Sequence, residues 1–243
     1  MDYYMFLVLL FLCVYNGVSL SEKKKRFVLQ GNAEQQLTQL VAQFEVYRQK
    51  VDRLEADLNL MRQSVSSTYV RWGRTSCSGS GTELVYKGYA GGSMDSDIGS
   101  AADFLCLPDS PSWAEYQNQS LRYGSVYGAE YFFAEFNPFA VNTYDDVPCC
   151  VCRVPRTAII MIPGSTNCYQ GWTMEYTGYL MSGAAGDEGA TNYVCVDENP
   201  ETVKRGSADD LDHSMCLVDV HCGSLPCPPY VEGRQLACAV CSK

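Results

Sequence analysis

Apolar residues recur every seven positions between residues 33 and 66. No Pro or Gly interrupts residues 33–65, so the pattern covers more than four heptads. A repeat of this length predicts a coiled coil of several chains rather than a simple amphipathic helix. The core positions are Leu37, Phe44, Val51, Leu58 and Val65 at a, with Leu40, Tyr47, Leu54 and Met61 at d.

The charges beside this apolar seam favour parallel pairing of the chains. Lys50 at g meets Glu55 at e of the next chain, and Asp57 meets Arg62 in the same way. Such pairs between g and e stabilise parallel coiled coils. The mixed a and d residues leave the number of chains open, but Val41 at e widens the seam and favours three or more. We therefore expect a homo-oligomer, a trimer, with a helix packed on its own domain as the alternative.

After Ser67 the seven-residue pattern stops, and short apolar runs alternate with residues typical of turns. Such runs occupy residues 69–72, 83–86, 104–107 and 158–162. Gly, Tyr, Ser and Cys become frequent over the same part of the chain. This pattern predicts many short strands, and hence a mostly β fold preceded by an α-helical coiled coil.

The first residues have the pattern of a signal peptide. An apolar run from Met5 to Tyr15 is too short to span a bilayer, and small residues follow it near a cleavage site at Ser19 to Ser21. We expect residues 1–20 to be removed and residues 21–32 to form a polar linker. No later segment reads as a membrane span, which predicts a secreted, extracellular protein. The basic run 23–26 is expected to be a solvated tail; a processing site and a contact for anionic glycans are the alternatives.

Cysteine usage and charge agree with this location. Of the 13 Cys, Cys13 lies in the signal peptide, so 12 remain, the even number that a fully disulfide-bonded extracellular protein needs. The formal charge of −10 argues against a nucleic-acid partner.

Cysteine spacing also reveals an internal repeat. Cys77, Cys106, Cys149 and Cys152 are followed, at offsets of 91, 89, 89 and 89 residues, by Cys168, Cys195, Cys238 and Cys241. Local sequence repeats with them, since Tyr-Lys-Gly-Tyr at 86–89 matches Tyr-Thr-Gly-Tyr at 176–179. We expect two disulfide-rich β subdomains, 69–153 and 154–243, packed about a pseudo-two-fold axis.

Residues 69–243 resemble a known family. The motifs are Cys-Cys-Val-Cys-Arg-Val-Pro at 149–155, Ile-Met-Ile-Pro at 160–163, Cys-Tyr-Gln-Gly-Trp at 168–172 and Ser-Gly-Ala-Ala-Gly-Asp-Glu-Gly at 182–189. In this order they are similar to the junction between the two halves of the collagen IV C-terminal non-collagenous domain. The runs 69–74, 86–90 and 104–108 resemble the C-terminal domains of sponge short-chain (spongin-like) collagens. No Gly-X-Y tract is present, and the predicted coiled coil takes the place of a triple helix.

The resemblance implies four disulfides, Cys77–Cys152, Cys106–Cys149, Cys168–Cys241 and Cys195–Cys238. Four cysteines depart from the family pattern, and two pairings stay open for them. Either Cys216–Cys222 forms with Cys150–Cys227, or Cys222–Cys227 forms with Cys150–Cys216.

The residues give little support for a catalytic site or a metal-binding site. The Cys-x-x-Cys pairs at 149–152 and 238–241 have zinc or redox spacing, but behind a signal peptide they predict structural disulfides. The two histidines, His213 and His221, carry no triad motif and are expected in loops. We expect no enzyme activity, no cofactor and no metal. Calcium bound by the acidic runs 197–201 and 209–212 is the alternative to solvated loops.

A glycoprotein is indicated by the sequon at Asn118, which would mark a surface position if it is used.

Together these features predict a secreted extracellular-matrix assembly protein, a coiled-coil oligomer presenting collagen IV-like domains to matrix proteins or glycans. The alternative is a secreted multivalent recognition protein, lectin-like or an immune binder, because clustered heads gain avidity.

Overall fold

The computed structural model describes residues 20–99, 101–115, 124–204 and 213–243. The predicted signal peptide up to residue 19, Cys13, the sequon at Asn118 and the acidic run 209–212 lie outside these residues. The chain divides into two compact units, one ending at Arg62 and the other running from Gln63 to Lys243.

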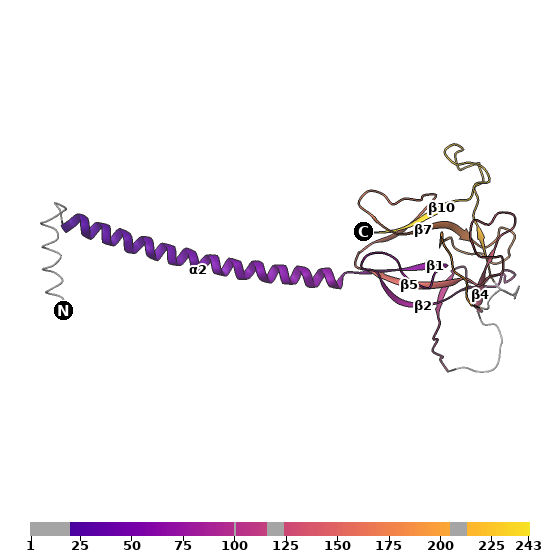
Figure 1. Ribbon diagram of the computed structural model, residues 1–243, viewed down its shortest axis with the longest axis horizontal. Helices are drawn as coiled ribbons and strands as arrows, with labels where there is room; N and C mark the ends of the chain where they lie inside the picture. Colours follow the sequence, from indigo (N-terminus) through magenta and orange to yellow (C-terminus); the bar gives the residue numbers. More distant parts are fainter. Residues whose placement is uncertain (1–19, 100, 116–123, 205–212) are drawn as a thin grey trace. The chain divides into compact units, whose positions relative to one another are not determined.

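Helix α2 (Leu20–Ser64) is the whole described part of the first unit (Figure 1). It contains the heptads but starts earlier than the coiled-coil prediction, so the expectation of a polar linker at residues 21–32 is wrong. Glu, Lys, Arg, Gln and Leu dominate that segment, and they are good helix formers that outweigh the single Gly31. The helix also stops one residue before Val65, the last predicted a position. None of the described helical residues forms a stretch apolar enough to cross a membrane.

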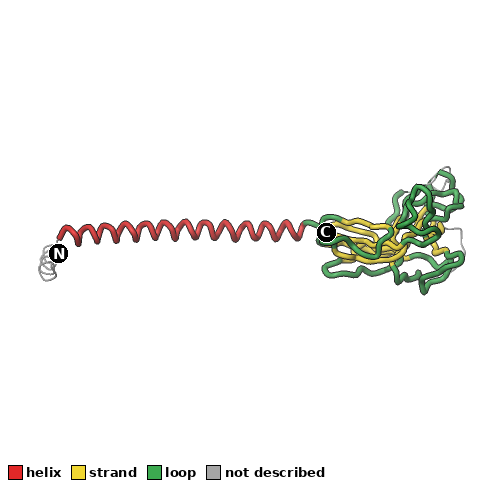
Figure 2. The backbone as a smooth tube through the Cα atoms, turned by 90° about the horizontal axis from the view of Figure 1, so that it is seen from above, coloured by secondary structure: helices red, strands yellow, loops and turns green. Residues whose placement is uncertain are grey.

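The second unit is mostly β, as the sequence predicts. Its described strands form one mixed sheet in the order β6-β10-β7-β8-β1-β5-β2-β4-β9, and β3 adds to β2. Figure 2 shows these strands running side by side, with most of the loops gathered at the end opposite Lys243. The strands are β1 (Ser67–Trp72), β2 (Glu83–Gly92), β3 (Leu105–Pro108), β4 (Tyr127–Phe132), β5 (Pro148–Val154), β6 (Ile159–Pro163), β7 (Thr173–Ser182), β8 (Val194–Asp197), β9 (His213–Leu217) and β10 (Ala237–Ser242).

The two halves of the sheet use the same strand pairings. In the first half β1 and β2 both pair antiparallel with β5, and β2 pairs with β3. In the second half β6 and β7 both pair antiparallel with β10, and β7 pairs with β8. Two parallel pairings join the halves, β1 with β8 at Trp72 and Val196, and β4 with β9 from Ala129 and His213 onward.

Two buried clusters form the core, and each draws on both halves. One contains Trp72, Phe104 and Tyr131 from the first half with Met181 and Met215 from the second. The other contains Tyr69, Cys150, Cys152, Tyr176, Leu180 and Val240. Because both clusters need residues from both halves, neither half has a complete core by itself.

Candidate functional site

The apolar seam of helix α2 is exposed along its whole length. Leu37 is 61% exposed, Phe44 70% and Leu54 58%, and the remaining a and d side chains are exposed as well. A run of large apolar side chains exposed along one helix is unfavourable in water and is typical of a contact surface. The predicted coiled-coil residues are thus available for another chain, together with the flanking charged residues Lys50, Glu55 and Asp57, which are also exposed.

The cysteines of the β unit form the four disulfides that the family resemblance implies. These bonds are Cys77–Cys152, Cys106–Cys149, Cys168–Cys241 and Cys195–Cys238. They connect corresponding places in the two halves, because the first and third bonds close loops of 75 and 73 residues and the other two close loops of 43 residues each. A fifth bond, Cys222–Cys227, closes a short loop.

The expectation that all 12 cysteines are paired is wrong, because Cys150 and Cys216 carry free thiols. Cys222–Cys227 excludes one of the two open pairings, and the other fails at its second bond, Cys150–Cys216. Cys150 lies on β5 and Cys216 on β9, and strands β2 and β4 separate them in the sheet. Three strand spacings amount to about 14 Å, beyond the Cα distance of about 7 Å that a disulfide can span.

Cys150 nevertheless lies beside a disulfide. Its Sγ is 3.7 Å from the Sγ of Cys152, and the sulfurs of Cys77, Cys150 and Cys152 all lie within 4.8 Å of one another. Burial raises the pKa of the Cys150 thiol to about 11 and that of Cys216 to about 12. Two of the three clustered sulfurs are bonded to each other, so this cluster does not offer the three thiolates that a metal ion would need.

A buried ion pair, Arg71–Asp197, and a hydrogen bond from Tyr69 to Glu175 join the two halves of the sheet. The Arg71 guanidinium donates from Nε to Oδ2 of Asp197 at 2.8 Å, and its Nη2 lies 2.6 Å from the same oxygen. Both side chains are buried. Glu175, also buried, accepts from Nη2 of Arg156 at 2.6 Å and from the Tyr69 hydroxyl at 3.3 Å. Removing one member of such a pair leaves an uncompensated buried charge, which makes the junction intolerant of substitution.

The histidines occupy unlike positions. His221 is exposed, with Nδ1 3.1 Å from a carboxylate oxygen of Glu232. The expectation that His213 lies in a loop is wrong, because it begins β9 and is fully buried against the ring of Phe104. Its Nδ1–H donates to the carbonyl of Ser93, whereas its Nε2 has no hydrogen-bond partner among the described residues. Burial lowers the pKa of His213.

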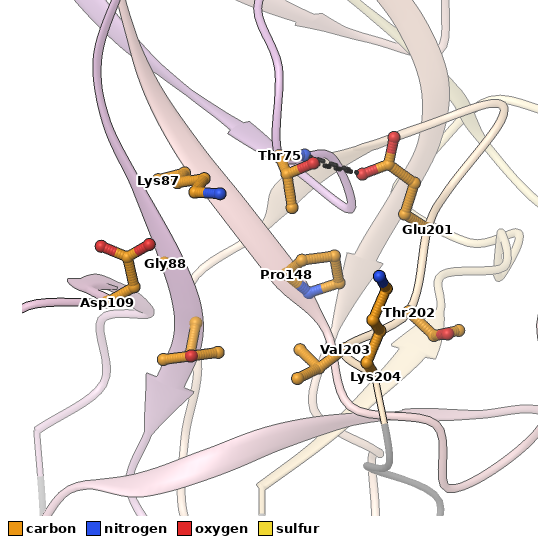
Figure 3. A pocket seen from close by; sticks show the side chains of 10 residues that line it. Thr75, Lys87, Gly88, Asp109, Pro148, Glu201, Thr202, Val203 and Lys204 are labelled. Carbon is orange, nitrogen blue, oxygen red and sulfur yellow. Dashed lines mark hydrogen bonds between the residues drawn. The ribbon is translucent and has the colours of Figure 1, made fainter.

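An open pocket of about 560 Å³ lies where the two halves meet (Figure 3). On its wall Glu201 accepts from the backbone N–H of Thr75 at 3.0 Å and from the Thr75 hydroxyl at 2.7 Å. Its other oxygen lies 3.3 Å from Nη2 of Arg74. In the acidic run 197–201, where the sequence leaves calcium as an alternative, Asp197 pairs with Arg71 and Glu201 with Arg74. The lining residues are Thr75, Lys87, Gly88, Tyr89, Asp109, Pro148, Glu201, Thr202, Val203 and Lys204.

Sequence reasoning did not find this pocket. Its two lysines, Lys87 and Lys204, lie in different halves, one within a repeat motif and the other after an acidic loop. Only the folded chain brings them together. A search for known protein families found no family model that matches this chain.

Proposed function

We propose that the protein is an extracellular assembly protein whose helix gathers chains into a parallel trimeric coiled coil. The observation that carries this proposal is the continuous exposed seam from Leu37 to Met61. A helix in a protein gains most of its stability from packing its apolar face, so a 45-residue helix with an exposed seam is best explained by contact with further copies.

We further propose that the β unit is a duplicated module related to the collagen IV non-collagenous domain, which makes lateral contacts in the assembly. Equal strand pairings in the two halves and four disulfides at corresponding positions support duplication about a pseudo-two-fold axis. Gly88 and Gly178 support it as well, because an added Cβ at either would overlap a carbonyl oxygen of the neighbouring strand.

An extracellular location is supported by the five disulfides, since such bonds persist in oxidising compartments and are rare in the cytosol. The signal-peptide pattern points the same way.

Sedimentation equilibrium of seam variants of the full chain tests the assembly proposal. Leu54→Asp with Leu58→Asp places charges in the seam and should reduce the trimer to monomers, because buried unpaired charges are strongly unfavourable. Leu60→Asp is the matched control, since Leu60 lies at position c, outside the seam, and is 72% exposed. A trimer that survives the double substitution would show that the seam does not assemble the chains.

Multivalent recognition is the second candidate function. The pocket that contains two lysines favours it, because a coiled coil would present several copies of that pocket and raise avidity.

A further inference from the structure

The pocket in Figure 3 has walls that the fold holds in place. Strand β2 supplies Lys87 and Tyr89, and the backbone N–H of Asp109 bonds to the carbonyl of Lys87 at 3.1 Å. The opposite wall comes from the second half. There the N–H of Glu201 bonds to the carbonyl of Gly73 at 2.7 Å, and the N–H of Val203 bonds to the carbonyl of Asp146 at 3.2 Å. These bonds fix the pocket's two sides across the junction of the halves.

The residues that line the pocket include two lysines, Lys87 and Lys204, and two acidic residues, Asp109 and Glu201, so the pocket lacks the negative excess of the chain as a whole. Arg74 and Thr75 already satisfy the Glu201 carboxylate. Among the residues that the structure describes, Lys87 and Lys204 have no ion pair. In Figure 3 the amino groups of Lys87 and Lys204 lie on either side of Pro148. A chain with a formal charge of −10 thus presents two unpaired ammonium groups on one concave surface.

The other lining groups suit a sugar better than a small inorganic ion. The volume of about 560 Å³ falls in the range of organic-ligand sites. Asp109 is exposed and can accept hydrogen bonds from hydroxyl groups, and Thr202 offers an exposed hydroxyl. Tyr89 is 47% exposed, and its ring can pack against the face of a sugar.

We propose that this pocket binds an anionic saccharide, with Lys87 and Lys204 holding a sulfate or carboxylate group and Asp109 accepting from sugar hydroxyls. The proposal rests on the second candidate function, multivalent recognition, and needs only one β unit per site. Charge-assisted hydrogen bonds from the two ammonium groups provide the specificity for an anion.

Calorimetric titration of the full chain with a sulfated tetrasaccharide prepared from heparin tests the proposal. We expect binding that weakens as salt is added, because the lysines are exposed to solvent. Lys87→Ala with Lys204→Ala should weaken binding about tenfold or more, because two charge-assisted hydrogen bonds are lost. Asp109→Ala should also weaken binding, because it removes the acceptor for the sugar hydroxyls. All three positions are exposed, so the fold tolerates these changes.

Charge-matched controls locate the site. Lys24→Ala with Lys25→Ala removes the same charge from the basic run and should leave the affinity unchanged. Loss of binding in that variant, with wild-type affinity in the pocket variant, would overturn the proposal by placing the anion on the basic run. A chemically desulfated, N-acetylated tetrasaccharide that retains its carboxylates shows whether sulfate or carboxylate is held. Tighter binding of an acidic peptide than of any saccharide, or no saccharide binding, would also overturn it.

These measurements distinguish a failure of the assembly proposal from a failure of the ligand-binding proposal. The pocket variant should sediment as the wild-type protein does, and the Leu54→Asp, Leu58→Asp variant should keep the affinity per site. A loss of saccharide binding in the seam variant would contradict a site contained in one β unit.

Discussion

The sulfur atoms of Cys77, Cys150 and Cys152 lie close enough for Cys77 to have two alternative partners. Replacing Cys152 with Ser leaves Cys150 within reach, and we expect the variant to fold with a Cys77–Cys150 disulfide. Peptide mapping by mass spectrometry identifies the bond. Cys150→Ser is the control and should keep Cys77–Cys152. Free thiols on both Cys77 and Cys150 in the Cys152→Ser variant would contradict the prediction.

Buried His213 gives the β unit a pH dependence of stability. Burial lowers its pKa in the folded chain, although the hydrogen bond to the Ser93 carbonyl and the nearby Asp187 and Asp95 favour the charged form. The unfolded chain therefore binds a proton below the ordinary pKa of 6.5 more readily than the folded chain does. The free energy of unfolding should fall as the pH drops below that value, by at most about 1.4 kcal/mol per pH unit for one proton.

Urea unfolding at pH 7 and pH 5 checks this expectation for the full chain and for His213→Gln. The variant should lose less stability between the two pH values than the wild-type protein. Glu232 is not expected to contribute in this window, because its pKa is lowered from 4.5. Equal losses in both proteins would assign the pH dependence to other groups.

At the scale of single elements, strands β7 and β8 approach closely at Gly178. An added Cβ there would overlap the carbonyl oxygen of Val196, which is backbone and cannot move without disturbing the strand pairing. Gly178→Ala should lower the free energy of unfolding by about 3 kcal/mol, the upper range for overpacking. Gly186→Ala is the control, because a Cβ at Gly186 meets nothing within 4 Å and should change stability by less than about 0.5 kcal/mol. Chemical denaturation of both variants measures the difference.

Periodic patterns in the sequence predicted which helix or strand forms better than they predicted its first and last residues. The heptads correctly predicted a helix over residues 33–64, because the helical period is a local property of the sequence. The same pattern could not show that residues 21–32 continue the helix, since they have helix-forming residues without an apolar period. It also gave no sign that His213 begins a buried strand, because β9 is completed by its pairing with β4, more than 80 positions earlier.

For the whole molecule, the family resemblance implied the four corresponding disulfides, which the structure contains, but the sequence did not predict how the halves join. The parallel pairings of β1 with β8 and β4 with β9, the Arg71–Asp197 pair and the pocket all connect distant residues. Such contacts leave no local pattern, because each partner alone looks like an ordinary polar or apolar position. The free thiol of Cys150 has the same origin, since sheet order rather than cysteine number prevents its bond with Cys216.

Assembly through the helix is the central claim, and the mass of the full chain in solution tests it most directly. Sedimentation equilibrium over a range of concentrations should give three times the mass of the single mature chain, because the exposed seam needs partners to cover it. The mass of a single chain at every concentration would contradict the account.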